Sequence, residues 1–343
     1  MSGEVLRLGI VGAGAIVRSH HLPGFRAVPG VKVEAVVNRT RESSERAAEE
    51  LGIPRVCEHW RDLVHDDDLD AVVVATWPYL HAPVAIAALD AGKHVLVQAR
   101  FAMDAGEARA IRAAAMRRPD LVAMVSPAPH TLWADATVQR LLARGAIGDL
   151  RLVRAFWGGG DGGRRTPPAW RQQRRYSGNN VLELGIVYEA LARWVGHATW
   201  VQASEHLFDP ASPLGPADVP DHVSVLAGLP GGAALTVDLS PHARFGGPNG
   251  AYLFGSAGTL VVDVTGRRLT LRHDDGLEED VTPGPGERGA WRVEAEFIGA
   301  IRGTEDVRLT DVDTAVRYME FTDAVRRSAA EGRRVGLPLI VNG

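Results

Sequence analysis

The sequence has a single cysteine, Cys57, among its 343 residues. One cysteine excludes a disulfide within the chain and a metal centre built from several thiolates. The formal net charge is only −4, so we expect no clustered basic face for nucleic acid phosphates. No apolar run is long enough to cross a bilayer, and the amino terminus lacks the pattern of a secretory signal. These absences favour a cytoplasmic protein that binds a small molecule.

Motifs of metal-dependent and acyl-transfer enzymes are also missing. No two histidines stand at ligand spacing together with a carboxylate on one helix face, so we expect no metal. There is no Gly-any-Ser-any-Gly segment, the motif that would present a serine nucleophile.

Residues 1–126 alternate short β-branched runs with alanine-rich amphipathic segments. The runs are LRLGIVG, KVEAVVN, LDAVVVAT, KHVLVQ and LVAMVS. This alternation is typical of βαβ units that build a parallel sheet covered on both faces. We predict an α/β, Rossmann dinucleotide-binding domain over 1–126.

Residues 127–343 have a different pattern, with longer and more widely separated strands such as DLRLVRAFW, DHVSVLAGL and GAALTVDLS. This spacing indicates a large, mostly antiparallel sheet. Helices are predicted over 180–195, with a stop at Gly196, and near 291–301 and 312–330. We therefore expect a second, α+β domain for substrate binding and oligomerisation.

A glycine-rich loop follows the first predicted strand. Gly12 permits a tight turn, and Gly14 lets the backbone approach a pyrophosphate, which then lies at a helix N-terminus formed by Ala15 and Ile16. Val17 stands where a third glycine is common. The motif is weak alone, but a strand before it and a helix and strand after it predict a nicotinamide dinucleotide site.

The second predicted strand ends at Asn38, Arg39 and Thr40. An NAD site usually has a carboxylate here for the ribose hydroxyls, whereas an arginine can pair with the 2′-phosphate of NADP. We therefore favour NADP over NAD as cofactor. The alternative is that Arg39 is only a solvated side chain at a strand end.

Another ligand-binding edge is expected after the LDAVVVAT strand, where Thr76, Trp77 and Pro78 form a turn. Thr76, Pro78 and His81 could line the nicotinamide crevice, and Trp77 could contact substrate. For His81, packing against or capping the next helix is an equal alternative.

Four segments in order resemble the glucose-fructose oxidoreductase, inositol dehydrogenase and rhizopine-catabolism (Gfo/Idh/MocA) family. They are GIVGAGAIVRSHHLPGF, TWPYLHAPVAIAALDAGKHVLVQ, SGNNVLELGIVYEALARWVG and YLFGSAGTLVVD. The resemblance implies a Rossmann domain followed by a β-rich substrate domain. It also implies oxidation or reduction of sugars, inositols and related polyols with NAD or NADP.

The chain departs from this family at both positions that carry its acid/base chemistry. The family's fifth strand typically ends Glu-Lys-Pro, and here the matching residues are Gln98, Ala99 and Arg100. The family's aspartate and histidine on the substrate-domain helix match Glu183 and Val187. We expect Gln98 beside the cofactor and Arg100, whose guanidinium stays protonated, to bind a substrate oxygen.

The reaction still needs a group that handles the proton. Glu183 is our first candidate because it holds the surviving acidic position, and burial would suit it to acid/base work. The alternative is a glutamate favoured only by the helix dipole. Tyr188 is the second candidate, and its alternative is a core tyrosine.

Five arginines lie between a glycine-rich run and the helix at 180–195: Arg164, Arg165, Arg171, Arg174 and Arg175. Such a loop could close on a substrate that carries a carboxylate or phosphate, with Arg171 as the predicted contact. The alternative is a solvated loop or an oligomer contact.

These patterns together predict an NADP-preferring oxidoreductase, active on a sugar, polyol or related hydroxy or keto compound, that forms a homodimer or homotetramer. Two alternatives stay open. One is a non-catalytic nucleotide-binding sensor or regulator. The other is a lyase or glycosidase that uses bound NAD without net redox change.

Overall fold

The computed structural model describes residues 5–158, 169–243 and 246–340. The described chain divides into two compact units that are not continuous in sequence. Unit 1 comprises residues 1–127, 175–178 and 292–319, and unit 2 comprises 128–174, 179–291 and 320–343. Among the described residues, no helix is both long and apolar enough to cross a membrane.

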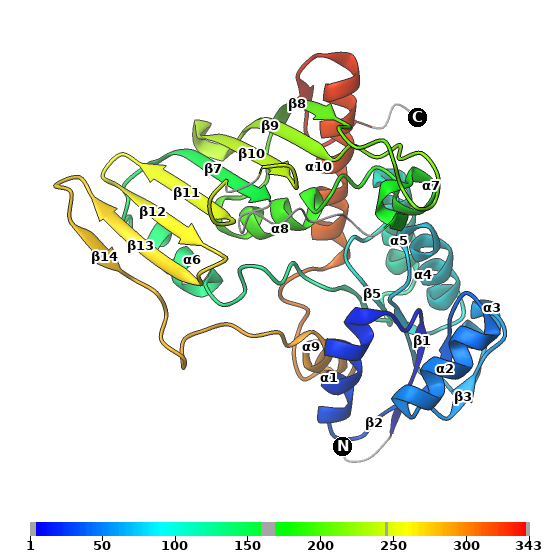
Figure 1. Cartoon of the computed structure of the whole chain (residues 1–343). Helices are drawn as coiled ribbons and strands as arrows, with labels where there is room; N and C mark the ends of the chain where they lie inside the picture. Colours follow the sequence, from blue (N-terminus) through cyan, green and yellow to red (C-terminus); the bar gives the residue numbers. More distant parts are fainter. Residues whose placement is uncertain (1–4, 159–168, 244–245, 341–343) are drawn as a thin grey trace. The chain divides into compact units, whose positions relative to one another are not determined.

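Unit 1 contains a parallel sheet with the strand order β3-β2-β1-β4-β5-β6 (Figure 1). The strands are β1 (Leu6–Val11), β2 (Val31–Val37), β3 (Arg55–Val56), β4 (Ala71–Val74), β5 (His94–Val97) and β6 (Ala123–Val125). Strands β1, β4 and β5 are apolar and almost wholly buried, as expected for a parallel sheet covered on both faces. This confirms the predicted Rossmann fold.

The helices of unit 1 connect these strands and cover the sheet. They are a π-helical turn (Val17–His21), α1 (Leu22–Ala27), α2 (Arg41–Leu51), α3 (Trp60–Val64), a 3₁₀ turn (Pro78–Leu80), α4 (His81–Asp90) and α5 (Ala105–Arg117). Helix α9 (Val293–Ile301) comes from the far end of the chain and packs against α1. There Glu294 contacts the buried His21, so unit 1 needs a segment distant in sequence.

The described part of unit 2 contains a nine-stranded sheet with the order β14-β13-β12-β11-β7-β10-β9-β8-β15. The strands are β7 (Leu150–Gly158), β8 (Trp200–His206), β9 (His222–Gly228), β10 (Ala234–Ser240), β11 (Gly250–Gly255), β12 (Gly258–Asp263), β13 (Arg268–His273), β14 (Glu278–Asp280) and β15 (Val335–Gly336). Only the pair β7–β10 is parallel, and the other neighbours are antiparallel. The predicted antiparallel sheet is confirmed.

Alternate residues of these strands are buried, which gives the sheet a covered face and an open face. On β7, for example, Val153, Ala155 and Trp157 are buried, while Arg154 is exposed. Helices α6 (Asp135–Ala143) and α8 (Leu184–Val195) run along one face (Figure 1).

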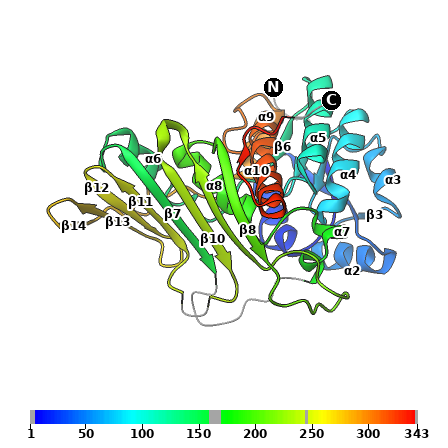
Figure 2. The same ribbon diagram turned by 90° about the horizontal axis from the view of Figure 1, so that it is seen from above.

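The remaining helices are short turns and one long helix. They are the 3₁₀ turns Ala169–Gln172 and Pro230–Gly232, α7 (Arg174–Ser177) and α10 (Val312–Glu331), which is upright in Figure 1 and is viewed nearly along its axis in Figure 2. Helix α8 ends at Gly196, which has a φ of 78°. This is the stop that the sequence predicts, because glycine adopts positive φ without a steric penalty.

Candidate active site

The loop after β1 has the backbone form that a dinucleotide site needs. Gly12 has a φ of 94°, and a Cβ built on it would lie 2.7 Å from Cα of Thr76. A Cβ built on Gly14 would meet nothing within 4 Å. The first glycine is therefore required by the fold itself, whereas the second leaves open space where a pyrophosphate can approach the backbone.

A pocket of about 490 Å³ opens at the carboxyl ends of β1, β2 and β4, the edge at which open α/β sheets bind ligands. Residues predicted from the sequence form much of its wall: Gly12, Gly14, Asn38, Arg39, Thr76 and Trp77. The space above Gly14 and these donors fit a nicotinamide dinucleotide. Ala15, Thr40 and Pro78 lie next to wall residues in sequence without belonging to the wall, and Ile16 lies two residues beyond Gly14.

The side chain of Asn38 holds the glycine loop in place. Its Oδ1 accepts a hydrogen bond from the N–H of Ala13 at 2.7 Å, and its Nδ2 donates to the carbonyl of Ser43 at 2.9 Å. Thr40 caps α2, where its hydroxyl accepts from the N–H of Ser43. Both residues therefore shape the pocket through the backbone.

Arg39 lies at the pocket wall with its guanidinium 5.5 Å from the ring centre of Trp77. Among the described residues it forms no ion pair. The neighbouring Arg41 is engaged with Glu45 and Glu58, and Glu58 also lines the pocket. Arg39 is thus the cation best placed to meet a phosphate here.

Aromatic rings gather beside this pocket within unit 1. Trp77 lies 5.0 Å from Tyr176 and 6.4 Å from Tyr79, measured between ring centroids. Trp77 and Tyr79 both belong to the pocket wall. They offer flat apolar surface of the kind that packs against a planar ligand ring.

His81 lies inside unit 1 and is not part of the pocket wall. Its Nε2 lies 3.0 Å from the carbonyl oxygen of Thr76, and its Nδ1 lies 3.2 Å from that of Phe101. Burial lowers the pKa of His81 to about 4, so the ring is neutral at physiological pH. These contacts favour the alternative in which His81 packs within the fold and does not line the nicotinamide crevice.

The end of β5 carries the residues that replace the family's Glu-Lys-Pro. Gln98 Oε1 lies 2.8 Å from Nε2 of His21, whose Nδ1 lies 2.6 Å from Oε1 of Glu294. Arg100, two residues after Gln98, is only 2% exposed. The turn at the end of β5 is thus anchored by a chain of polar side chains, Gln98, His21 and Glu294.

In unit 2, three charged or titratable side chains meet at the N-terminal end of α8. Glu183 is the residue just before the helix and is 41% exposed. One carboxylate oxygen lies 3.5 Å from Nε2 of His130, and the other lies 3.6 Å from Nη1 of Arg171. Burial lowers the pKa of Arg171, and the Glu183 carboxylate opposes this shift. The structure thus brings the predicted Glu183 and Arg171 together.

His130 was not predicted as a site residue from the sequence. It lies between β6 and α6, far from α8 in the sequence, and no helical or strand period connects the two segments. The available signal was a histidine preceded by two prolines, Pro127 and Pro129, after a predicted strand, which is consistent with many roles.

Tyr188 lies in the core of unit 2. Its ring stacks on Phe321 with centroids 3.6 Å apart, and its hydroxyl accepts a hydrogen bond from the N–H of Ala198 at 2.8 Å. Val187, at the family's histidine position, is also fully buried. These contacts are those of the core tyrosine that the sequence left as an alternative.

The arginine run is only partly described. Arg164 and Arg165 lie outside the described residues. Arg171 reaches Glu183, whereas Arg174 donates to the carbonyl of Asp218 and to the side chain of Asn179.

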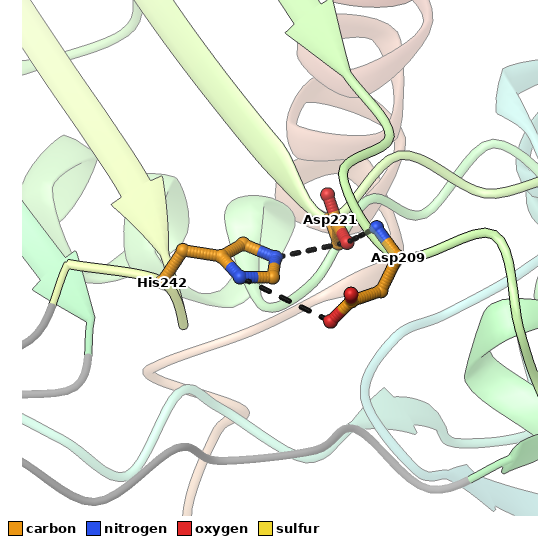
Figure 3. A group of neighbouring side chains, drawn as sticks. All are labelled: Asp209, Asp221 and His242. Atoms are coloured by element: carbon orange, nitrogen blue, oxygen red, sulfur yellow. Dashed lines mark hydrogen bonds and ion pairs between the residues drawn. The ribbon is translucent and has the colours of Figure 1, made fainter.

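One further cluster contains side chains of metal-binding type: Asp209, Asp221 and His242 (Figure 3). Nε2 of His242 lies 2.9 Å from Asp221, and its Nδ1 lies 4.0 Å from Asp209. The carboxylate of Asp221 also accepts from the backbone N–H groups of Phe208 and Asp209. Because the two carboxylates approach opposite nitrogens of one ring, the arrangement suits ion pairs that tie two loops together.

Comparison with known proteins agrees with this geometry. Residues 6–126 match the family model described as "Oxidoreductase family, NAD-binding Rossmann fold", and residues 136–261 match "GFO/IDH/MocA C-terminal domain". The chain is 30% identical to dTDP-3,4-didehydro-2,6-dideoxy-alpha-D-glucose 3-reductase of Streptomyces violaceoruber, over 95% of this chain and 96% of that protein.

Levoglucosan dehydrogenase is similar in both sequence and structure. The enzyme of Pseudarthrobacter phenanthrenivorans is 27% identical over 97% of this chain and 94% of its own. A solved levoglucosan dehydrogenase in complex with NADH and levoglucosan superimposes with a TM-score of 0.84 at 25% identity, covering 97% of this chain and all of the other. With these matches over almost its whole length and a dinucleotide pocket in unit 1, the chain belongs to the Gfo/Idh/MocA family of NAD(P)-dependent oxidoreductases.

Proposed function

We propose that the protein is an NADP-preferring oxidoreductase that interconverts a hydroxyl and a keto group on a sugar, polyol or related compound. The observation that carries the cofactor preference is the end of β2. No carboxylate stands there, Asn38 is engaged in holding the glycine loop, and Arg39 lies over Trp77 at the pocket wall. An arginine in this place suits a 2′-phosphate. The substrate class follows the named activities of the relatives.

The residues of unit 1 fit this cofactor. Gly12 and Gly14 would hold its pyrophosphate, and Thr76 would line the same pocket. Gln98, which follows β5, would lie beside the cofactor. When bound, the nicotinamide supplies or accepts a hydride. Arg100 and Trp77 remain the proposed contacts of unit 1 with substrate.

The proton that accompanies the hydride must be handled by the protein. We place this step at the N-terminal end of α8, where Glu183 and Arg171 lie together. Arg171 can orient a substrate oxygen, and its lowered pKa reflects a guanidinium removed from water.

Cofactor preference is tested by calorimetric titration of the nucleotide-free protein with NADPH and with NADH. For Arg39→Ala we expect about tenfold weaker NADPH binding and little change for NADH. Arg41→Ala is the matched control, since Arg41 is engaged with Glu45 and Glu58. If Arg39→Ala loses affinity equally for NADPH and NADH, Arg39 does not bind the 2′-phosphate.

The reaction is tested by following nicotinamide absorbance with levoglucosan, inositols and keto sugars. Reduction of NADP⁺ or oxidation of NADPH by any of these compounds supports the proposal. No turnover across the panel would favour a nucleotide-binding sensor or regulator. Product formed without net change in nicotinamide would favour a lyase or glycosidase.

We also propose that the protein forms a homodimer or homotetramer through the open face of its large sheet. This face holds a hollow of about 780 Å³ whose wall includes Arg154, Phe156, Phe208, Tyr252 and Phe254. Tyr252 is 40% exposed and Phe208 is 58% exposed. Exposed aromatic side chains around a hollow are typical of protein interfaces. Sedimentation of the wild type and of Tyr252→Glu tests this assignment.

A further inference from the structure

His130 has the surroundings of an acid/base residue rather than those of a packed core histidine. Its ring lies against Trp157 of β7, with centroids 5.9 Å apart. Its Nε2 is buried, makes no hydrogen bond to the described residues and lies 3.5 Å from the carboxylate of Glu183. One quarter of the side chain is nevertheless exposed.

The two ring nitrogens therefore face different surroundings. A carboxylate beside Nε2 favours the tautomer that carries its hydrogen on that atom, as in histidine–carboxylate pairs of hydrolytic enzymes. Nδ1 then keeps its lone pair, and it makes no hydrogen bond within the described part of the chain. A 3.5 Å separation is longer than a good hydrogen bond, but such pairs commonly tighten when substrate binds.

Glu183 is less suited than His130 to accept the proton itself. Its two oxygens are shared between Arg171 and His130. These contacts occupy lone pairs with which the carboxylate would accept a proton from substrate. Histidine, in contrast, changes charge near neutral pH without any special environment.

We propose that His130 exchanges the proton with the substrate hydroxyl and that Glu183 positions its ring. This inference rests on the proposed function and names the acid/base residue of that reaction. In the oxidative direction the O–H proton of a secondary alcohol passes to Nδ1 of His130. The C–H hydrogen leaves with its electron pair as hydride to the bound NAD(P)⁺, and a C=O bond forms. Reduction of the ketone runs through the same atoms in reverse.

The test uses the full-length protein and the compound of the panel that the wild type turns over. We expect His130→Asn to lower kcat by about 10²- to 10⁴-fold, the usual contribution of general acid/base catalysis. NADPH affinity should stay unchanged. His130→Gln, whose longer side chain keeps more of the packing against Trp157, repeats the measurement if the asparagine variant folds poorly. In His130→Ala, added imidazole should restore part of the lost rate.

The chain supplies a matched control for this pair. His273 on β13 lies 3.4 Å from Glu279 on β14, a similar separation in a pair whose side chains are somewhat more exposed. His273→Asn and Glu279→Gln should leave kcat within about twofold of the wild type, because exposed pairs contribute little.

The positioning role of Glu183 has its own readout. With ¹⁵N-labelled histidine, nuclear magnetic resonance should show His130 mainly as the Nε2–H tautomer at neutral pH. Glu183→Gln should remove this preference, lower kcat and change the pH profile of kcat/KM.

Three results would overturn the inference. If the wild type turns over no compound of the panel, the proposed function fails and this assignment fails with it. If turnover exists and His130→Asn keeps it, only this assignment fails. A fall in kcat with no rescue by imidazole, and with an unchanged tautomer in Glu183→Gln, would show that His130 merely packs.

Discussion

The glycine loop after β1 offers backbone groups to a ligand, whereas the N-terminal end of α8 offers side chains. The loop keeps the backbone geometry that a dinucleotide requires, down to the open space above Gly14. At the helix end Val187, the residue that we match to the family's histidine, is buried, and Glu183, His130 and Arg171 lie together. The glycine loop binds through its backbone, so it depends on a particular backbone conformation that few substitutions preserve. Proton transfer needs only a titratable group within reach, and a different segment can supply one.

Two histidines show the same contrast at the level of single side chains. His81 is buried between the carbonyl groups of Thr76 and Phe101 and is neutral. His130 has one nitrogen beside a carboxylate, and its side chain remains partly exposed. Only the second arrangement combines access with a charged partner.

The largest predicted effect concerns Gly12 and Gly14 of the glycine loop, whose substitution should affect stability and NADPH binding respectively. Gly14→Val should weaken NADPH binding by about 1,000-fold, or about 4 kcal/mol, because its side chain would occupy the space of the pyrophosphate. Its thermal unfolding should match the wild type, since a Cβ there meets nothing within 4 Å. Gly12→Ala should instead lower the melting temperature. If Gly14→Val binds NADPH normally, the glycine loop does not hold the pyrophosphate.

A smaller effect concerns the stability of unit 1 in acid. The pKa of His81 is about 4 when folded, against an ordinary value near 6.5. The folded state therefore binds fewer protons, and stability falls as the pH drops from above 6.5 towards 4, by about 3 kcal/mol from this group. Urea unfolding at several pH values measures this. His81→Gln should be less stable at pH 7.5 and should show a flatter pH dependence; an equally steep one would exclude His81 as the cause.

Tyr188→Phe sharpens the contrast between core and catalytic residues on α8. Removal of the hydroxyl leaves the buried N–H of Ala198 without its partner, which should cost about 2 kcal/mol of unfolding free energy. At temperatures well below unfolding, kcat should stay within about threefold of the wild type, because no proton transfer is lost. A loss of kcat with unchanged stability would instead return Tyr188 to the list of acid/base candidates.

The smallest predicted effect lies at the pocket wall. Glu58 is an exposed carboxylate that lines the pocket and pairs with Arg41. Glu58→Gln should strengthen NADPH binding by about threefold at low salt and leave NADH unchanged, because one negative charge near the 2′-phosphate is removed. Titrations at two salt concentrations measure this. Equal changes for both nucleotides would place the 2′-phosphate away from Glu58.

Much of the fold could be predicted because its signals are local in sequence. The strands that became β1, β2, β4 and β5 are runs of apolar residues with helices between them, and Gly196 stops α8 where expected. Strand β3, of two residues, is too short to show a period. The division of the chain was harder to foresee, because 292–319 belong to unit 1 through contacts that no local pattern records.

The candidate site could be predicted only where one segment contains the whole signal. The glycine loop and Arg39 lie at the pocket wall as the pattern implies. The pair of His130 and Glu183 joins two segments that are far apart in sequence, and its members are common residue types. The burial of Tyr188 depends on Phe321, near the end of the chain. Such contacts arise from tertiary packing, which the spacing of residues in the sequence does not reveal.

The discontinuous construction of unit 1 has a consequence for synthesis on the ribosome. His21 is fully buried, and its partner Glu294 is separated from it by 273 residues. The N–H of Phe101 donates to the hydroxyl of Tyr318, which is 217 residues further along. The nucleotide-binding half therefore emerges first but cannot complete its interior until most of the chain has been translated. During that interval its early segments expose surface that the finished fold buries, and such surface favours aggregation.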